Sequence, residues 1–325
     1  MEALQTQAPP IPKTPLAWVI ANTLTLFVPF TALAYVGFQL ITNQFSGLQL
    51  GLFIGFLILT LLGTGLGYHR YFSHHSFKAN RGLKILLGVL GSAGGLGPIC
   101  WWTAIHRQHH RFTDGHKDPH TPHLEGSGLL QNLKNIWMAS FGFTYNYSIH
   151  GLFMAYPEKD THGYSKEFRA SVQDLMKDSD IRRIDRNYVV SLLAFILIPG
   201  LLMFAITGVA SDIWQGALWG GLARISANQC IFAFINNIGH RFGPQPFDSN
   251  DESRNLYWFA IFSNGESLHN NHHAFPASAK AGMEWWQIDL NYYFLAAFVK
   301  MGWATQVRVP SVTELSRKRK QSGQK

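Results

Sequence analysis

Four long runs of apolar residues constrain the fold of this chain more than any other feature. They cover residues 16–40, 48–68, 188–210 and 213–238. A helix needs about 20 residues to cross the hydrocarbon core of a bilayer, and each run has that length. The short connectors 41–47 and 211–212 join the runs in two pairs. The sequence therefore predicts an all-α integral membrane protein with four transmembrane helices in two hairpins.

The two long polar segments, 69–187 and 239–325, are predicted to form one helical cap on the cytoplasmic side. They hold nearly all of the Lys and Arg residues, whereas the two connectors hold none. Basic residues accumulate on the cytoplasmic side of membrane proteins, so we expect both termini there as well. The net charge of +8 then suits anionic lipid headgroups and requires no nucleic acid. Because we find no internal repeat or low-complexity linker, we expect a single domain over residues 1–325.

One further apolar stretch, Leu83 to Trp102, is not predicted to span the membrane. It contains five glycines and one proline, which disfavour a straight helix. If the stretch did cross, the histidines before and after it would lie on opposite sides of the bilayer. We therefore expect an interfacial or re-entrant segment.

Nine of the fifteen histidines fall into four clusters near the ends of the predicted spans. The clusters are HRYFSHH with His69 and His74, HRQHH with His106, His109 and His110, NNIGH with His240, and HNNHH with His269, His272 and His273. Residues three and four apart share one face of a helix, so each HxxHH motif can direct three rings to one point. If the topology holds, all four clusters meet at one membrane face. The isolated histidines are expected to be ordinary hydrogen-bonded groups: His116, His120, His123, His150 and His162.

This concentration of imidazole indicates a metal centre, because so many buried rings without a shared partner would leave polar atoms unsatisfied. Nine ligands exceed the four of a zinc site and would suit two ions with open positions. Imidazole binds Zn, Cu, Fe and Ni, so the ligands alone do not identify the metal. The soluble di-iron carboxylate bundle needs two Glu-x-x-His motifs, and only Glu266 to His269 fits. Glu266 is therefore expected to orient a ligand ring, and Asp118 and Glu125 either do the same or are plain surface charges.

Taken together, these motifs closely resemble those of the membrane-bound fatty acyl desaturases, the family of stearoyl-CoA and bacterial acyl desaturases. The resemblance extends from about Tyr68 to Trp286, and the strings PFDSNDESRN and HNNHHAFPASAKAG are similar to the bacterial members in particular. A bacterial inner membrane is the location that this similarity implies. His75 follows His74 where the family usually has Arg, so it is either an extra ligand or a polar neighbour.

The resemblance implies a di-iron centre that uses O2 and two electrons to remove two hydrogens from a long acyl chain, giving a cis double bond of the delta-9 type. It implies that Asn236 reaches one iron through a water and that Trp102 lines the bend of the substrate tunnel. The iron ligands that it implies are His69, His74, His106, His109, His110, His240, His269, His272 and His273.

Substrate recognition is less well defined by the sequence. Arg224 lies inside the fourth apolar run, where a charge usually faces the protein interior or a polar cavity. We hypothesise that it lies beside the acyl tunnel, the alternative being a structural, hydrogen-bonded arginine. The segments GSGLLQNLKNIW and GESLH depart from the strings common in the family. The acyl carrier is therefore left open between CoA, lipid and carrier protein.

The main alternatives to desaturation are a related di-iron acyl hydroxylase or acetylenase, since the outcome depends on sub-ångström placement of the C–H bond. A membrane metal transporter is a remote alternative, because transport sites lie near the bilayer midplane. Electrons must come from an external donor such as ferredoxin or cytochrome b5. The chain has no HPGG haem motif, no GxGxxG and no cysteine cluster, so no haem or flavin is expected in it. Basic residues that could dock the donor or an anionic headgroup are Arg107, Arg111 and Lys117.

Overall fold

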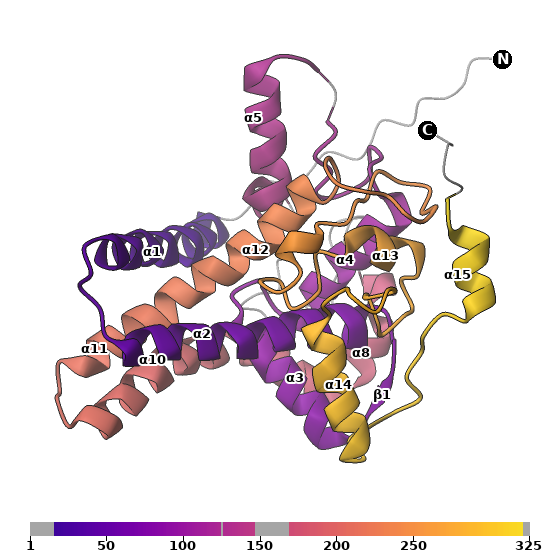
Figure 1. Cartoon of the computed structure of the whole chain (residues 1–325). Coiled ribbons are helices and arrows are strands. Elements are labelled where there is room, and N and C mark those ends of the chain that lie inside the picture. The colour runs from indigo at the N-terminus through magenta and orange to yellow at the C-terminus, as the bar shows by residue number, and fades with distance from the viewer. Residues whose placement is uncertain (1–15, 125, 147–168, 321–325) are drawn as a thin grey trace.

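The computed structural model describes residues 16–124, 126–146 and 169–320 (Figure 1). In the first part, the elements are α1 (Leu16–Ile41), α2 (Gly47–Leu61), the π-helical η1 (Leu62–Ser73), β1 (Lys78–Ala79), α3 (Arg81–Ala93), α4 (Ile99–Phe112), α5 (Leu129–Trp137), the π-helical η2 (Met138–Gly142) and α6 (Phe143–Asn146). The second part comprises α8 (Gln173–Lys177), α9 (Ser179–Arg186), α10 (Tyr188–Thr207), α11 (Asp212–Gly216), the π-helical η3 (Ala217–Ala223), α12 (Arg224–Ile238), the short 3-10 turn η4 (Tyr257–Phe259), α13 (His269–Ala274), α14 (Leu290–Lys300), β2 (Ala304–Thr305) and α15 (Val312–Lys318). The prediction of a mainly helical chain is confirmed.

Three helices of the described part are long and apolar enough to cross a membrane, namely Val19–Ile41, Gly47–Ser73 and Tyr188–Thr207. They correspond to the first three predicted spans. The fourth predicted span is helical as α11, η3 and α12, but it is not among these three helices. Polar residues such as Arg224, Asn228 and Gln229 make this run less apolar than the others. The first three runs are therefore confirmed as helices of membrane-spanning length, and the fourth crossing stays a prediction.

The two hairpins pack against each other. α1 and α2 both contact η3 and α12, and α10 contacts α11, η3 and α3. Figure 1 shows α1, α2, α10 and α11 at one end of the molecule, with α12 running from this end toward its middle. Trp219 of η3 is fully buried between Phe45 and Phe53, and its Nε1 donates to Gln39 Oε1 at 2.9 Å. Burial of this large ring fixes how the hairpins fit together.

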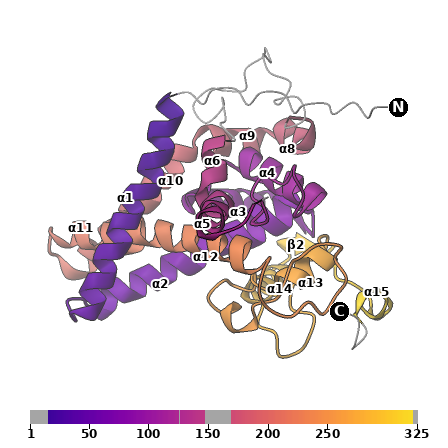
Figure 2. The same ribbon diagram turned by 90° about the horizontal axis from the view of Figure 1, so that it is seen from above.

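The other half of the molecule is built around η1. Figure 2 shows α13, α14 and α15 on the side opposite α1 and α11. Helix α3 packs along η1, and β1 pairs antiparallel with β2, with Lys78 opposite Thr305. A cluster of buried side chains from η1, α3 and α14, including Leu66, Leu87 and Leu295, forms the core between these elements. Segments far apart in the sequence, η1 with α3 and the C-terminal α14, therefore pack into one unit.

The apolar stretch from Leu83 to Trp102 does not form one helix. α3 ends at Ala93 and α4 begins at Ile99, after a turn in which Gly95 (φ +74°) and Gly97 (φ +94°) adopt left-handed backbone conformations. Glycine adopts such conformations without steric cost, and the following Pro98 is compatible with a helix start. The expected interruption of this segment is confirmed, and its position at the membrane interface stays a prediction.

Candidate metal centre and adjoining cavity

The structure brings all nine clustered histidines together in two adjacent groups. In each group the candidate ligand atoms lie within 4.8 Å of one another. The first group is His69, His74, His106, His110 and His272, and the second is His109, His240, His269 and His273. The four sequence motifs therefore converge, although each motif except HRYFSHH and the single His240 divides its rings between the two groups.

Four elements carry these rings. His69 lies in η1 and His74 directly follows it, and the HRQHH motif forms the last turns of α4. His240 lies two residues beyond α12, and the HNNHH motif makes up most of the short α13. π-helical turns inside longer helices are frequent at functional sites, and η1 is such a turn. It lets two rings five residues apart contribute to the same group.

The first group has the spacing of ligands around one ion. The Nε2 atoms of His69 and His272 are 2.8 Å apart, and those of His272 and His110 are 2.9 Å apart. The Nε2 atoms of His74 and His106 are also 2.9 Å apart. Two ring nitrogens that each lie about 2.1 Å from a metal, at right angles, are about 3.0 Å apart. The residues therefore fit a transition metal at their centre.

The second group shows the same fit and leaves ring nitrogens unused. His240 Nε2 and His269 Nε2 are 2.9 Å apart. The Nε2 atoms of His109 and His273 are buried and have no hydrogen-bond partner within the part of the chain that the structure describes. Buried polar atoms without partners are rare, and a metal ion is the partner that such convergent nitrogens suit.

Glu266 contacts one ring of the first group, that of His69, which is the kind of contact expected for it from the sequence. One carboxylate oxygen accepts a hydrogen bond from His69 Nδ1. The other oxygen accepts from Arg70 Nη2 and from Asn291 Nδ2, each at 2.8 Å. Burial alone would raise the pKa of Glu266, but the positive charge of Arg70 and the hydrogen bond from His69 hold it well below its usual range. The residue is therefore a permanent carboxylate that directs His69 Nε2 toward the other rings.

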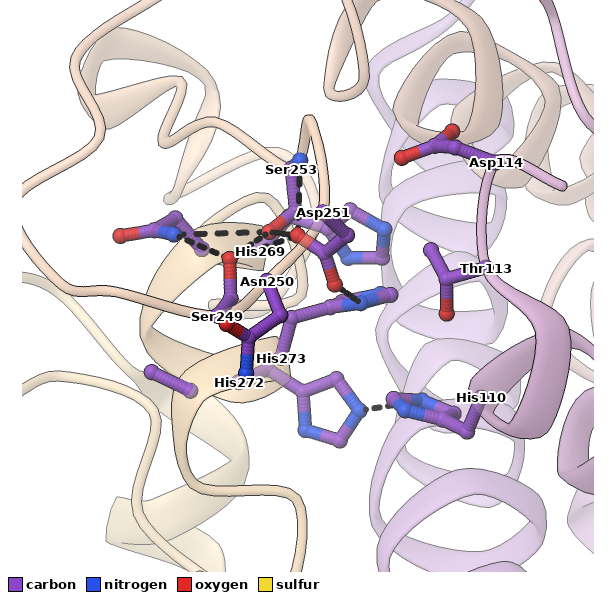
Figure 3. Close-up of polar contacts among 12 residues, drawn as sticks. His110, Thr113, Asp114, Ser249, Asn250, Asp251, Ser253, His269, His272 and His273 are labelled. Atoms are coloured by element: carbon purple, nitrogen blue, oxygen red, sulfur yellow. Dashed lines mark hydrogen bonds and ion pairs between the residues drawn. The ribbon is translucent and has the colours of Figure 1, made fainter. Parts of the chain in front are cut away.

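Carboxylates orient three rings of the second group. Asp118 lies 3.0 Å from His109 Nδ1, Asp114 lies 3.1 Å from His240 Nδ1, and Asp251 lies 2.7 Å from His273 Nδ1. Burial would raise the pKa of Asp118, but His109 lowers it, and the pKa of His109 is raised in return despite its burial. In Figure 3 Asp251 reaches His273 from the loop before α13, while His272 faces His110 on α4.

Asp118 was predicted from the sequence, whereas Asp114 and Asp251 were not. Each lies near one of the histidine motifs or a quoted string in the sequence. Asp114 follows His110 by four residues, and Asp251 lies inside the PFDSNDESRN string. Nothing local in the sequence tells which imidazole each carboxylate contacts, because their partners are distant along the chain. Glu125, His150 and His162 lie outside the described residues.

A cavity of about 340 Å³ adjoins the two groups. Its lining includes His69, His106, His269 and Asn236. The Trp102 ring also lines it and stacks on His106, with 4.8 Å between ring centroids and 11° between planes. Side chains such as Ile105, Leu192 and Phe232 make the remaining walls largely apolar. A flexible hydrocarbon chain is the kind of ligand that such a cavity accommodates beside a metal centre.

The structure does not bring Arg224 to this cavity. Its guanidinium is fully buried and donates to the backbone oxygens of Gly220 and Phe195, each at 3.1 Å, and to that of Ala93. It is not among the described residues that line the cavity. These contacts favour the structural alternative, in which Arg224 ties α12 to α3 and α10.

Two further histidines differ in their environments. His75 is more than half exposed and contacts Asp174 at 2.9 Å, as expected of a polar neighbour. His120, expected to be an ordinary hydrogen-bonded group, is buried against His109 with ring centroids 4.2 Å apart, and it lines the cavity. Its Nδ1 has no hydrogen-bond partner among the described residues. Burial lowers the pKa of His120 to about 3, so the ring is neutral.

The basic residues proposed to dock an electron-donor protein already contact other residues of this chain. Arg107 donates to the backbone oxygens of Phe72 and Ser73 at 2.8 and 3.0 Å and forms an ion pair with Asp174. Arg111 and Lys117 both lie over the Phe112 ring. Arg107 is therefore a poor candidate for a docking residue, because its donors are already used.

Comparisons with known proteins find a family of enzymes and several relatives that act on acyl chains. Residues 45–309 match the family described as fatty acid desaturase. The chain is 36% identical over 304 residues to a hex-5-enoyl-[acyl-carrier protein] acetylenase of Moorena producens (strain JHB). The matched region covers 93% of this chain and 88% of that protein. It is 34% identical over 271 residues to delta-9 acyl-lipid desaturase 2 of Arabidopsis thaliana, covering 82% and 77%. It is also 28% identical over 308 residues to the sn-1 stearoyl-lipid 9-desaturase of Synechocystis sp. (strain ATCC 27184 / PCC 6803 / Kazusa), covering 94% and 85%.

Proposed function

Because this chain belongs to the fatty acid desaturase family and is an oxidoreductase, we propose that it inserts a cis double bond, of the delta-9 type, into a long acyl chain. The observation that carries the proposal is the joint geometry of the two histidine groups and the apolar cavity. His69, His106 and His269 belong to the groups and also line the cavity. A chain in the cavity therefore lies directly beside the metal ligands.

The proposed ligands of two iron ions are the nine histidines, divided as the two groups, with Asn236 beside them at the cavity wall. When bound, the iron pair supplies the oxidant for the unactivated C–H bonds, which ordinary acid and base side chains cannot break. In the balanced reaction, one –CH2–CH2– unit, one O2, two electrons and two protons give –CH=CH– and two water molecules.

The protein's own side chains position the substrate and exclude water. Trp102, stacked on His106, forms a rigid wall that fixes where the acyl chain passes the histidines. Apolar walls keep bulk water from the reacting carbons and hold the chain in a limited set of conformations. Glu266, Asp114, Asp118 and Asp251 fix the ligand rings, so little rearrangement is needed during the reaction.

The proposed setting follows from the helices and the basic segments. Three helices long and apolar enough to cross a membrane support a membrane location. In our proposal this is a bacterial inner membrane, with the active site and both termini on the cytoplasmic side. An external ferredoxin-like or cytochrome b5-like protein delivers the two electrons. The chain is proposed to fold as a single domain over residues 1–325, with the fourth crossing made by α11, η3 and α12.

A second candidate activity is acetylenation, the conversion of an alkene to an alkyne on the same kind of centre. The observation that favours it is the similarity to the Moorena producens acetylenase, which extends over 93% of this chain. The same histidine groups would serve either reaction, since both remove two hydrogens from adjacent carbons. Metal transport does not fit an oxidoreductase of this family.

The test is product analysis in a bacterial host that lacks its own unsaturated fatty acids. Expression of the chain with a working electron donor should produce new monounsaturated acyl chains, and mass spectrometry locates the double bond. Feeding an alkenoic acid in parallel distinguishes acetylenation by the loss of two further hydrogens. Unmodified acyl chains, despite iron bound to the protein and a reduced donor, would refute the proposal.

A further inference from the structure

Helix α5 carries a row of exposed apolar side chains that the proposed chemistry does not use. The most exposed of them is Leu130, with 83% of its surface accessible. None of the row is among the described residues that line the cavity. A contiguous row of this kind on a protein surface indicates a partner other than water. The row consists of Leu129, Leu130, Leu133, Ile136 and Trp137.

These five side chains form one face of α5. At 100° per residue they fall within an arc of about 120°, with Leu133 near its centre. Polar side chains fill the rest of the helix surface, and one of them, Gln131, donates to Asn135 at 2.8 Å. Asn135 in turn donates to the backbone oxygen of Leu124 at 3.2 Å, so part of the polar side faces this chain while the apolar side faces away. This pattern is typical of a helix that lies at a membrane surface.

α5 runs across the direction of the membrane-length helices, at the end that carries the histidines. It continues without a break into η2 and α6. Asn237, near the end of α12, donates to Ser140 of η2 at 2.7 Å, and Phe141 packs on Phe30 of α1 with 5.5 Å between ring centroids. In Figure 1 α5 projects from the molecule across the direction of α1 and α2, and Figure 2 shows α5 end-on. Because spanning helices approximately follow the membrane normal, α5 lies roughly parallel to the plane of the membrane.

A second exposed apolar segment lies at the same level of α12. Trp258 packs on Phe234 of α12, with 5.9 Å between ring centroids, although 65% of its surface is exposed. Phe234 and Asn237 are three residues apart, which is about 4.5 Å along the helix axis. Two segments far apart in the sequence therefore expose apolar side chains at one level, and Trp is enriched where a membrane meets water. The exposed side chains of this second segment are Trp258, Ile261 and Phe262.

We propose that the apolar face of α5 and the η4 segment, residues 257–262, are seated in the surface of the lipid bilayer on the side that carries the histidines. Lipid is the occupant because the apolar face continues into the apolar surface of a span. Phe27 of α1 is exposed within one turn of Phe30, the partner of Phe141. Lys134 lies on the polar side of α5, where anionic headgroups attract a cation. The inference concerns residues outside the metal centre and the cavity, so it is tested separately from the proposed oxidation.

Fluorescent labels on the full-length protein in vesicles test the position of α5. Leu133→Cys places a label at the centre of the apolar face, and Asn132→Cys places one on the polar side. Cys230→Ser is included in both variants, while the buried Cys100 is retained. Brominated phosphatidylcholine quenches fluorescence from within the bilayer, and iodide quenches it from the water. Brominated lipid should quench the label at position 133 about threefold more than the label at position 132, and iodide should show the reverse order.

Both labelled side chains are exposed, so neither substitution disturbs the core, and thermal unfolding of the labelled protein checks the fold. Leu130→Cys gives a second position on the same face and should behave like Leu133→Cys. Equal quenching of positions 132 and 133 by iodide would place α5 in water and would overturn the inference. Protection of position 133 from both quenchers, with disulfide formation between two unlabelled Leu133→Cys chains, would assign the face to a second copy of this chain and would also overturn it.

The η4 segment is tested with a second pair of labels. The label of Phe262→Cys should be quenched by brominated lipid, whereas that of Arg317→Cys, exposed on α15, should be quenched by iodide alone. α15 provides the control because it lies on the side of the molecule opposite α1 and α11 (Figure 2). Iodide quenching at position 262 as strong as at position 317, without quenching by lipid, would show that the η4 segment lies in water and would overturn this part of the inference.

Discussion

At the scale of single residues, His74 and His75 are adjacent in sequence but differ in function. His74 Nε2 lies 2.9 Å from His106 Nε2 inside the first histidine group, whereas His75 is exposed and paired with Asp174. We expect His74→Ala to lower metal content and His75→Ala to leave it unchanged. Metal analysis of the two purified variants checks this, with each serving as the control for the other. Equal metal loss in both would show that His75 is a ligand.

The carboxylates behind the rings provide a second residue-scale prediction. Glu266→Gln keeps the shape of the side chain but removes the charge that orients His69, while Asp251→Asn does the same for His273. Partners that orient metal-bound histidines typically contribute about 10- to 100-fold in affinity. Each variant should therefore weaken one site, taking the protein from two metal ions toward one. Titration with a chelator resolves the two sites, and full retention of both ions in both variants would contradict the geometry.

These residues also show what a sequence reveals about such a site. The HxxHH spacing and the placement of the motifs beside apolar runs were enough to predict that nine rings converge, and the structure brings them together. The division into groups of five and four was not predictable, because it depends on how α4 and α13 face each other. Asp114 and Asp251 were missed for the same reason. Each is close to a histidine that lies elsewhere in the sequence or in another element.

At the scale of elements, the π-helical η1 depends on a close approach at Gly65. A Cβ atom there would lie 2.2 Å from Asn291 Nδ2 and 2.9 Å from Glu266 Oε1. Gly65→Ala should displace the carboxylate that orients His69, and overpacking of this kind costs about 1–3 kcal/mol. Gly55→Ala on α2 is the control, since nothing lies within 4 Å of a Cβ there. The unfolding temperature in detergent and the metal content should both fall only for Gly65→Ala. Unchanged values would show that η1 tolerates a side chain at this position.

Arg224 acts at the same scale, as a connection between helices. Its hydrogen bonds to the backbone oxygens of Gly220, Phe195 and Ala93 join α12 to α10 and α3. Arg224→Leu should lower stability by about 1–3 kcal/mol, as expected for losing buried hydrogen bonds of a charged group. The position of the double bond should not change. Altered bond position without loss of thermal stability would instead support the original hypothesis of a role beside the acyl tunnel.

The elements with a clear sequence pattern, such as long apolar runs and glycine-rich interruptions, were the most predictable. The first three apolar runs appear as helices long enough to cross a membrane, and the glycine-rich segment between Leu83 and Trp102 is interrupted, as expected. The π-helical turns were not predicted, and in η1 and η3 they contain glycines that lie against the backbone of another helix, which no local pattern reveals. Gly63 illustrates this, since a Cβ there would lie 2.2 Å from the Gly91 backbone nitrogen of α3.

For the molecule as a whole, the arrangement explains how a membrane protein reaches a lipid-like substrate. The helices that pack as two hairpins also form walls of the cavity, through residues of α1, α10 and α12. Histidines of both groups line the cavity, so substrate access and metal binding depend on the same set of elements. The ligands come from distant parts of the sequence, namely η1 and the residue after it, α4, the segment that follows α12, and α13.

In the proposed function, acyl oxidation depends on two metal ions held by the nine histidines. The most direct test measures bound iron and oxidised acyl product in the same preparations of the wild type and of His272→Ala. We predict two iron ions per wild-type chain together with a new double bond. We also predict that His272→Ala stays in the membrane but loses both oxidation and part of its iron. Full oxidation and full iron binding by His272→Ala, or oxidation by a wild-type protein that binds no iron, would show that oxidation does not depend on this metal centre.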